Sequence, residues 1–175
     1  IDLENDLVIG QYVRKGEGRG YMEEKGVANH SCTETFAALK MQIDNERWKG
    51  VDFFLRTGKH LKRKMAEVTI FYKNDLPNIK FKNAPQNRLT IRIQPDEGTT
   101  FHFNLMEPSN EQNIIEREMD FCQSCLLIED SPEAYEKMIY DVVMADRTLY
   151  TRWDEVEASW EFVDQMILPC HERGH

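Results

Sequence analysis

Alternating apolar and polar residues run through the first two-thirds of the chain. Residues 36–43 show the pattern clearly, because Leu39 and Met41 fall on one side and Lys40 and Gln42 on the other. A period of two residues predicts a β-strand with one apolar face. The same pattern predicts five further strands, at residues 51–56, 67–72, 88–95, 99–105 and 115–121. A turn at residues 96–98 joins two of them, which we expect to pair as an antiparallel hairpin.

The period changes in the last third of the chain, where apolar residues recur three and four positions apart. This spacing predicts two helices, one beginning after Ser131-Pro132 and one ending at Pro169. The first apolar stripe holds Ala134, Tyr135, Met138, Ile139, Val142 and Val143. The second holds Trp153, Val156, Trp160, Val163 and Ile167. The sequence therefore predicts an α+β fold in a single domain over residues 1–175, with a large, mainly antiparallel sheet and helices packed on one face.

Residues 1–30 are predicted to be mostly loop. Gly16, Gly18 and Gly20 stand at alternate positions, which suggests a phosphate-cradling loop. Such a loop lies between a strand and a helix, and no helical pattern follows here. We therefore favour a surface loop.

Composition limits the classes of function. With 175 residues, 41% of them hydrophobic and 30% charged, the chain has the size and composition of one soluble globular domain. The longest apolar runs fall well short of the ~20 residues that span a bilayer, and the start resembles no signal peptide, so we expect a cytoplasmic protein that binds no membrane. The net charge of −9 and the pI of about 5.1 argue against nucleic-acid binding.

The cysteines suggest neither a disulfide framework nor a metal site. Cys122 and Cys125 have CxxC spacing, which is also found in half zinc sites and redox pairs. A tetrahedral zinc site needs two more ligands, and His171 and His175 lie far away at the end of the chain. We favour two small side chains at the end of a strand, and expect no metal.

One basic cluster stands out against the acidic background. Arg56, Lys59, Lys62, Arg63 and Lys64 fall within nine residues. Concentrated cations favour an anion such as phosphate, for which lysine supplies a mobile point charge. Gly58 permits a tight turn or a close approach of the backbone. The alternative is a run of solvated surface lysines.

Several segments together resemble the glucose-6-phosphate dehydrogenase family. Residues 45–64 follow its pattern Asn-x-Arg-Trp-x-Gly-Val, then Arg-Thr-Gly-Lys and a second basic residue five positions later, although Asp52 replaces a family proline. Residues 31–40 are similar to its Ser-x-Thr-Glu-Thr-Phe-Ala-Ala signature, and residues 132–136 and 146–160 to its closing motifs. The resemblance extends from Gly10 to Ile167 and covers only the C-terminal domain of the family.

The resemblance implies roles for several residues. Lys59 and Lys64 match the positions that hold the sugar phosphate, and Gln94 matches a glutamine that contacts the sugar. Arg56 and Arg92 match two basic contacts of a second, structural NADP. The other positions of that nucleotide site are Met65, Thr69, Thr100 and His102. These lack the family's charged and stacking groups, so we expect no structural NADP, and expect Arg56 and Arg92 to pair with carboxylates such as Glu67 or Asp96.

The family also implies a reaction that this chain does not complete alone. The enzyme oxidises glucose 6-phosphate to 6-phosphogluconolactone with NADP, the first step of the pentose phosphate pathway. The chain has no GxGxxG fingerprint and none of its histidines, including His60, stands in the family's catalytic motif, so it is expected to be inactive without the N-terminal nucleotide-binding domain. We expect a homodimer formed through the polar sheet face that carries Thr90, Arg92, Thr100, His102 and Asn104. The alternative is a non-catalytic scaffold or regulatory module with the same fold.

Overall fold

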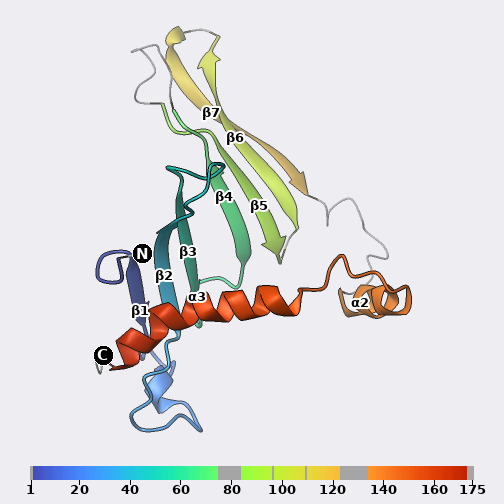
Figure 1. The fold of residues 1–175 in the computed structure, drawn as a ribbon. Coiled ribbons are helices and arrows are strands. Elements are labelled where there is room, and N and C mark those ends of the chain that lie inside the picture. Colours follow the sequence, from blue (N-terminus) through green and yellow to red (C-terminus); the bar gives the residue numbers. More distant parts are fainter. Residues whose placement is uncertain (1, 75–83, 96, 109, 123–133, 173–175) are drawn as a thin grey trace. The chain divides into compact units, whose positions relative to one another are not determined.

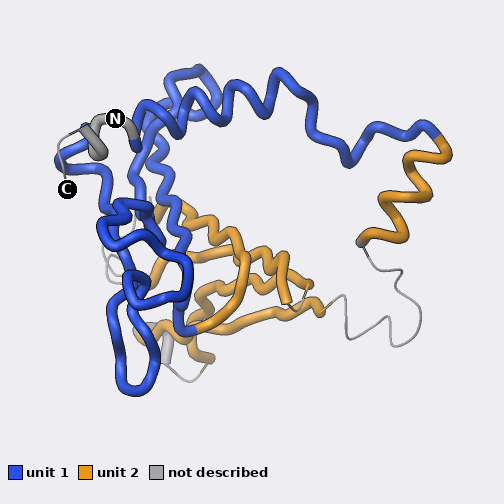
Figure 2. Tube along the Cα trace, turned by 90° about the horizontal axis from the view of Figure 1, so that it is seen from below, with its two compact units in different colours: residues 1–62, 145–175 blue, residues 63–144 orange. Residues whose placement is uncertain are grey.

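The computed structural model describes residues 2–74, 84–95, 97–108, 110–122 and 134–172. They form two compact units (Figure 2). The first unit comprises residues 1–62 and 145–175, and the second comprises residues 63–144. Each unit contains one antiparallel sheet and one α-helix (Figure 1).

The first unit contains a three-stranded sheet in the order β1-β2-β3. The strands are β1 (Leu7–Gly10), β2 (Phe36–Gln42) and β3 (Asp52–Gly58). Leu39 of the central strand pairs with Leu7 on one side and Leu55 on the other, and it is only 8% exposed. Alternation predicted β2 and β3 correctly. The expectation of loop was wrong for β1, because four residues are too few to show a period and the strand is fixed by its pairing with β2.

The glycines near the start of the chain lie in a turn at the surface. Lys15 and Gly18 form an isolated bridge, and Gly16 between them has a φ of 60°. Residues 13–19 are all exposed. A short 3₁₀ helix, η1 (Tyr21–Glu23), follows Gly20. This arrangement agrees with the surface loop that we favoured over a phosphate cradle.

The second unit contains a four-stranded meander in the order β4-β5-β6-β7. The strands are β4 (Ala66–Phe71), β5 (Arg88–Gln94), β6 (Gly98–Glu107) and β7 (Asn110–Cys122). The hairpin of β5 and β6 is confirmed, with Leu89 opposite Phe101. The α+β class is thus confirmed, but the strands of the described residues are hydrogen-bonded as two sheets and not as one large sheet. The basic segment between β3 and β4 takes no part in either ladder.

The sequence period also located both helices, α2 (Ala134–Val143) and α3 (Trp153–Glu172). The predicted cap of α2, Ser131-Pro132, lies outside the described residues. The prediction that Pro169 ends the second helix was wrong, because α3 continues to Glu172. Proline removes one backbone hydrogen bond and crowds the carbonyl four residues before it, which favours a helix end but does not impose one.

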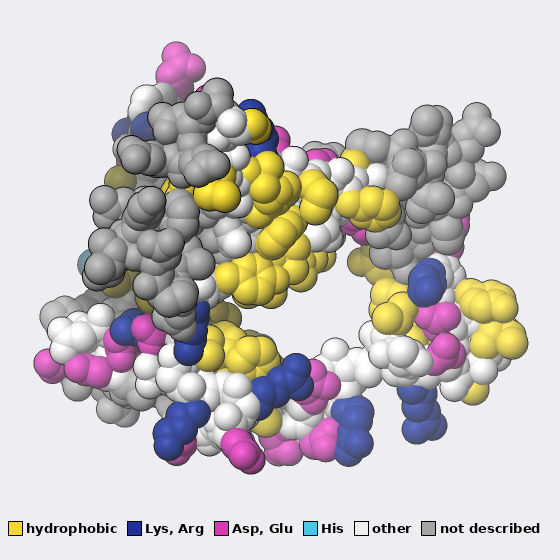
Figure 3. Space-filling model, turned by 90° about the horizontal axis from the view of Figure 1, so that it is seen from above, with side chains coloured by type: hydrophobic (Ala, Val, Ile, Leu, Met, Phe, Trp, Pro, Cys, Tyr) yellow, Lys and Arg dark blue, Asp and Glu magenta, His cyan; other side chains and the backbone are white. Residues whose placement is uncertain are grey.

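The apolar stripes of the helices are less covered than we expected. In α3, Met166 is buried and Val163 half-buried, but Trp153 and Trp160 are 80% and 62% exposed. Most apolar side chains of α2 are exposed as well, and apolar side chains are visible on the surface of the molecule in Figure 3. Exposure of most of these side chains therefore does not match the expectation of helices packed on one sheet face.

Candidate functional site

The basic cluster occupies the end of β3 and the connection that leads to β4. Lys59 directly follows the last residue of β3, and Lys64 lies two residues before the start of β4. Both lysines are exposed, as are Arg56, Lys62 and Arg63. Lys59 and Lys62 belong to the first unit, whereas Arg63 and Lys64 belong to the second. An exposed ammonium group is available to an anion from solvent.

Thr35 fixes the backbone at the start of this basic connection. Its carbonyl oxygen accepts a hydrogen bond of 2.8 Å from the N–H of Lys59. Its own N–H donates to Gly10 at 2.9 Å, and its hydroxyl oxygen accepts from the N–H of Tyr12 at 2.8 Å. Thr35 is buried. One residue thereby joins the end of β1, the start of β2 and the backbone of Lys59.

Gly58 is required by close packing and not by a tight turn. A Cβ at this position would lie 3.0 Å from Cδ2 of Phe36, and 3.3 Å from both Leu61 and the carbonyl oxygen of Thr35. The residue with a left-handed backbone in this segment is His60, with a φ of 51°. Of the two alternatives that the sequence left open at Gly58, the structure supports the close approach, and the unusual backbone conformation falls two residues later.

The ring of His60 contacts an aromatic pair. Its centroid lies 4.3 Å from that of Tyr12, which meets Tyr21 edge-on at 5.8 Å. Burial raises the pKa of Tyr12, whereas hydrogen bonds from Ser31 and then Thr33 lower the pKa of Tyr21. His60 is exposed, but its ring also contacts that of Tyr12.

Asp52 has polar partners on the neighbouring strand. The amide of Gln42, directly opposite on β2, donates a hydrogen bond of 2.6 Å to its carboxylate. Lys40 lies 3.4 Å from the same carboxylate. The Gln42 hydrogen bond, with the charge of Lys40, lowers the pKa of Asp52. At this position, where the family that the sequence resembles has proline, the Asp52 carboxylate is thus bound by two polar side chains of β2.

Gln94 and Lys64 lie at the same end of the second unit's sheet. Gln94 is the last residue of β5 and pairs with Ala66, two residues after Lys64. Both side chains are exposed. Two of the three predicted substrate-binding residues therefore belong to the same end of this sheet.

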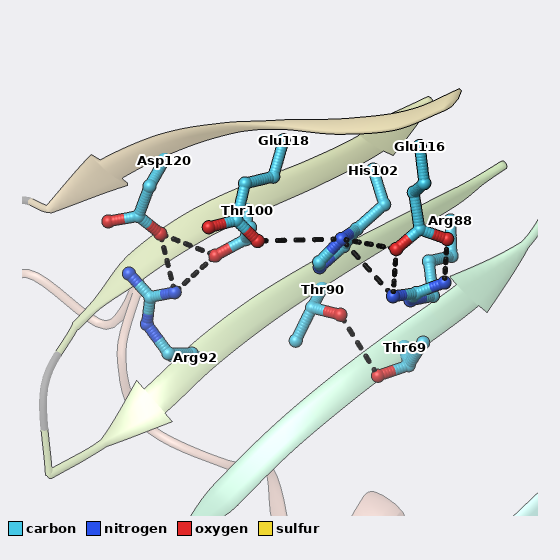
Figure 4. Close-up of polar contacts among 9 residues, drawn as sticks. All are labelled: Thr69, Arg88, Thr90, Arg92, Thr100, His102, Glu116, Glu118 and Asp120. Carbon is cyan, nitrogen blue, oxygen red and sulfur yellow. Dashed lines mark hydrogen bonds and ion pairs between the residues drawn. The ribbon is translucent and has the colours of Figure 1, made fainter. Parts of the chain in front are cut away.

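The polar face of the four-stranded sheet contains a row of ion pairs (Figure 4). Arg88 binds Glu116 through both ends of its guanidinium, each at 3.0 Å. Nδ1 of His102 lies 3.2 Å from Arg88, 3.6 Å from Glu116 and 3.7 Å from Glu118. The Arg88 hydrogen bond lowers the pKa of Glu116.

A second cluster on the same face involves Arg92. Its guanidinium donates to Asp120 at 2.7 Å and also to the hydroxyl of Thr100, which donates to Asp120 at 2.5 Å. The Arg92 and Thr100 hydrogen bonds lower the pKa of Asp120. Arg92 does pair with a carboxylate, but Asp120 is not one of the two that we named, because the partner comes from a strand two positions away in the sheet. Asp96 lies outside the described residues.

Arg56 does not follow the expectation of an ion pair. Its side chain is exposed on β3, and it forms no ion pair with a described carboxylate of its own unit. The predicted NADP contacts Arg56 and Arg92 thus belong to different units and have different surroundings.

Metal, membrane-spanning and cysteine sites are the remaining classes of functional site. In the described part of the chain, no group of three His, Cys, Asp or Glu side chains is placed to hold a metal ion. No described helix combines the length and the apolar character of a membrane span. Cys122 ends β7 and is disulfide-bonded, and Cys125 lies outside the described residues.

Sequence and structure comparisons identify relatives over almost the whole chain. Residues 1–173 match the family model described as glucose-6-phosphate dehydrogenase, C-terminal domain. The glucose-6-phosphate 1-dehydrogenase of Aggregatibacter actinomycetemcomitans is 44% identical over 99% of this chain and 36% of its own length. That of Treponema pallidum is 45% identical over 95% of this chain and 34% of its own length.

Two solved structures have the same fold. A glucose-6-phosphate dehydrogenase in complex with its substrate glucose-6-phosphate superposes with a TM-score of 0.86 and 34% identity, over 95% of this chain and 35% of that protein. The enzyme from Mycobacterium avium gives a TM-score of 0.72 and 33% identity, over 91% of this chain and 32% of that protein. The chain thus spans about a third of the length of the relatives that it matches.

Proposed function

The chain belongs to the family of glucose-6-phosphate dehydrogenase C-terminal domains, and on this basis we propose that it supplies the phosphate-binding half of that enzyme's substrate site. The observation that carries the proposal is the match to a dehydrogenase solved with glucose-6-phosphate, at a TM-score of 0.86 over 95% of this chain. In the proposed reaction the hydride on carbon 1 passes to NADP, and the hydroxyl proton passes to a base. The nucleotide site and the base are assigned to the rest of the protein.

Lys59 is the first of the two proposed phosphate ligands. Its ammonium group is exposed, while its backbone N–H is bound to the buried Thr35. A fixed Cα reduces the conformational freedom that must be lost when the side chain meets a phosphate dianion. Holding the phosphate also positions carbon 1 for hydride transfer.

Lys64 and Gln94 are proposed to bind the same substrate from the second unit. The strand register places them at one end of the sheet, where an ammonium and an amide are both open to solvent. The ammonium suits the phosphate, and the amide suits a sugar hydroxyl because it can donate and accept a hydrogen bond.

Lysine substitutions in the full-length protein test the phosphate assignment. We expect Lys59→Ala and Lys64→Ala each to raise KM for glucose 6-phosphate by about tenfold to a hundredfold, the usual effect of losing a hydrogen bond to a charged group. Lys62→Ala is the matched control, because Lys62 is exposed on the same connection and has no assigned role. An unchanged KM in both of the first two variants would contradict the assignment.

We further propose that the protein is a homodimer that works in the cytoplasm. The polar face of the four-stranded sheet supports the first point, since Arg88, Arg92 and His102 on β5 and β6 face a row of acidic residues on β7 (Figure 4). A two-fold interface uses the same patch on both subunits, so a patch with both charges offers each protomer groups of opposite charge to pair with. The charged, acidic composition supports the second point.

A further inference from the structure

Thr35 is a polar residue whose side chain and backbone are both committed to hydrogen bonds in the first unit. It is 8% exposed. Its hydroxyl oxygen accepts from the N–H of Tyr12, and its backbone binds Gly10 and Lys59. Tyr12 is beyond the end of β1 and Lys59 is beyond the end of β3. Thr35 therefore binds the segment after β1 and the segment after β3. Neither Tyr12 nor Lys59 belongs to a strand, so strand pairing does not hold their backbone N–H groups.

The segment after β3 is held from the same place by two further contacts. The ring of His60 lies on that of Tyr12, at 4.3 Å between centroids and 41° between planes. Gly58 approaches Phe36 and the carbonyl of Thr35 so closely that any Cβ would crowd them. The neighbours of Lys59 on both sides are thus fixed. Gly58 packs against Thr35, and His60 contacts Tyr12, whose N–H binds the Thr35 hydroxyl.

We propose that Thr35 is a positioning residue, which holds the backbone of Lys59 so that its ammonium group meets the substrate phosphate with little loss of conformational freedom. The inference rests on the proposed function, because it gives Thr35 a role only through Lys59. Thr35 itself is buried and does not touch the substrate. Tyr12 has the same role one step further away, since its N–H and its ring join Thr35 to His60.

The test is a double-mutant cycle in the full-length protein. Thr35→Val removes the hydroxyl but keeps the shape and both backbone groups, and Thr35→Ser restores the hydroxyl. We expect Thr35→Val to raise KM for glucose 6-phosphate about fivefold, which corresponds to one ordinary hydrogen bond, with kcat nearly unchanged. Thr35→Ser should return KM to near the original value. In a Lys59→Ala background, Thr35→Val should cause no further increase.

A second pair of variants keeps the proposal testable if Thr35→Val folds poorly. Tyr12→Leu removes the ring that contacts His60, and Tyr12→Phe keeps it. We expect a raised KM in the first and an unchanged KM in the second, and amide hydrogen exchange at Lys59 should become faster only in the first.

The outcomes separate this inference from the proposed function. A KM increase by Thr35→Val that is equally large with and without Lys59 would overturn the positioning role and leave the phosphate role of Lys59 intact. An unchanged KM in Thr35→Val and Tyr12→Leu would overturn it as well. An unchanged KM in Lys59→Ala would instead contradict the phosphate role of Lys59, and this inference would fail with it, whereas the proposed function fails only if Lys64→Ala leaves KM unchanged as well.

Discussion

At the scale of single residues, two glycines lie so close to neighbouring elements that a Cβ would crowd them. Gly58 lies against Phe36 and Thr35. Gly98 is buried at the start of β6, where a Cβ would lie 2.5 Å from the carbonyl oxygen of Phe121 and 2.6 Å from the guanidinium of Arg92. At Gly58 the missing side chain lets Phe36 and Thr35 approach, and at Gly98 it lets the β7 backbone and the Arg92 guanidinium approach.

Gly98→Ala tests this requirement. The added methyl would push against the backbone of β7 and displace Arg92 from Asp120, so we expect the free energy of unfolding to fall by about 1–3 kcal/mol. Chemical denaturation of this chain measures it. The control is Gly10→Ala, since a Cβ there meets no atom within 4 Å. Equal stability of the two variants would contradict the packing argument.

Asp120 should make stability depend on acid. Arg92 and Thr100 lower its pKa, so the folded state favours the ionised carboxylate. The stabilisation is present above the usual pKa of an aspartate, about 3.9, and is lost as pH falls through the lower value of the folded state. Unfolding measured between pH 5 and pH 2 should show a smaller loss of stability in Asp120→Asn than in the unchanged protein. Arg92→Met removes the main cause of the shift and should have the same effect; an undiminished acid response in both variants would contradict this account.

At the scale of elements, the sequence predicted best those strands and helices that are long enough to show several repeats of their apolar spacing. Alternation located β2 to β7, and helical spacing located α2 and α3. It missed β1, which is only four residues long, and misjudged Pro169, because a helix tolerates proline near its end. The sequence identified the basic connection and Gln94 as candidate functional residues. It did not identify Thr35 or Asp120, because their contacts are with residues that are distant along the chain.

The exposed stripe of α2 gives a prediction at this scale. Tyr135, Ile139 and Val143 are all largely exposed, so the helix presents apolar surface to water. We expect this chain to bind the dye ANS, and the double substitution Ile139→Glu and Val143→Lys to reduce the fluorescence with little change in melting temperature. The double substitution of two exposed polar residues, Glu155→Lys and Glu157→Lys in α3, is the control. A large drop in melting temperature in the α2 variant would show that the stripe is packed.

At the scale of the whole molecule, the ion pairs on the sheet of the second unit share one face. Ion pairs join β5 and β6 to β7 across this face, and Glu118 at its outer side is 66% exposed. The ion pairs stabilise the sheet of one protomer, and the exposed part of the Glu118 carboxylate can still contact a second protomer. The proposed dimer depends on such exposed charged groups.

Glu118→Arg tests the dimer. The substitution changes the exposed charge from negative to positive and places it beside His102, so we expect a shift from dimer to monomer in sedimentation velocity at micromolar concentration. Glu161→Arg makes the same charge change on the exposed surface of α3 and should leave the dimer intact. A dimer that survives Glu118→Arg, or a monomeric unchanged protein, would contradict the proposed interface.

The left-handed backbone at His60 has a consequence for natural variation in this family member. Single-nucleotide changes convert a histidine codon to asparagine or aspartate, which tolerate a positive φ, and also to proline, whose ring forbids it. Natural variants at this codon should therefore fall into two groups. Asparagine and aspartate should leave the folded protein about as stable as before, and proline should destabilise it strongly, whatever the role of the imidazole.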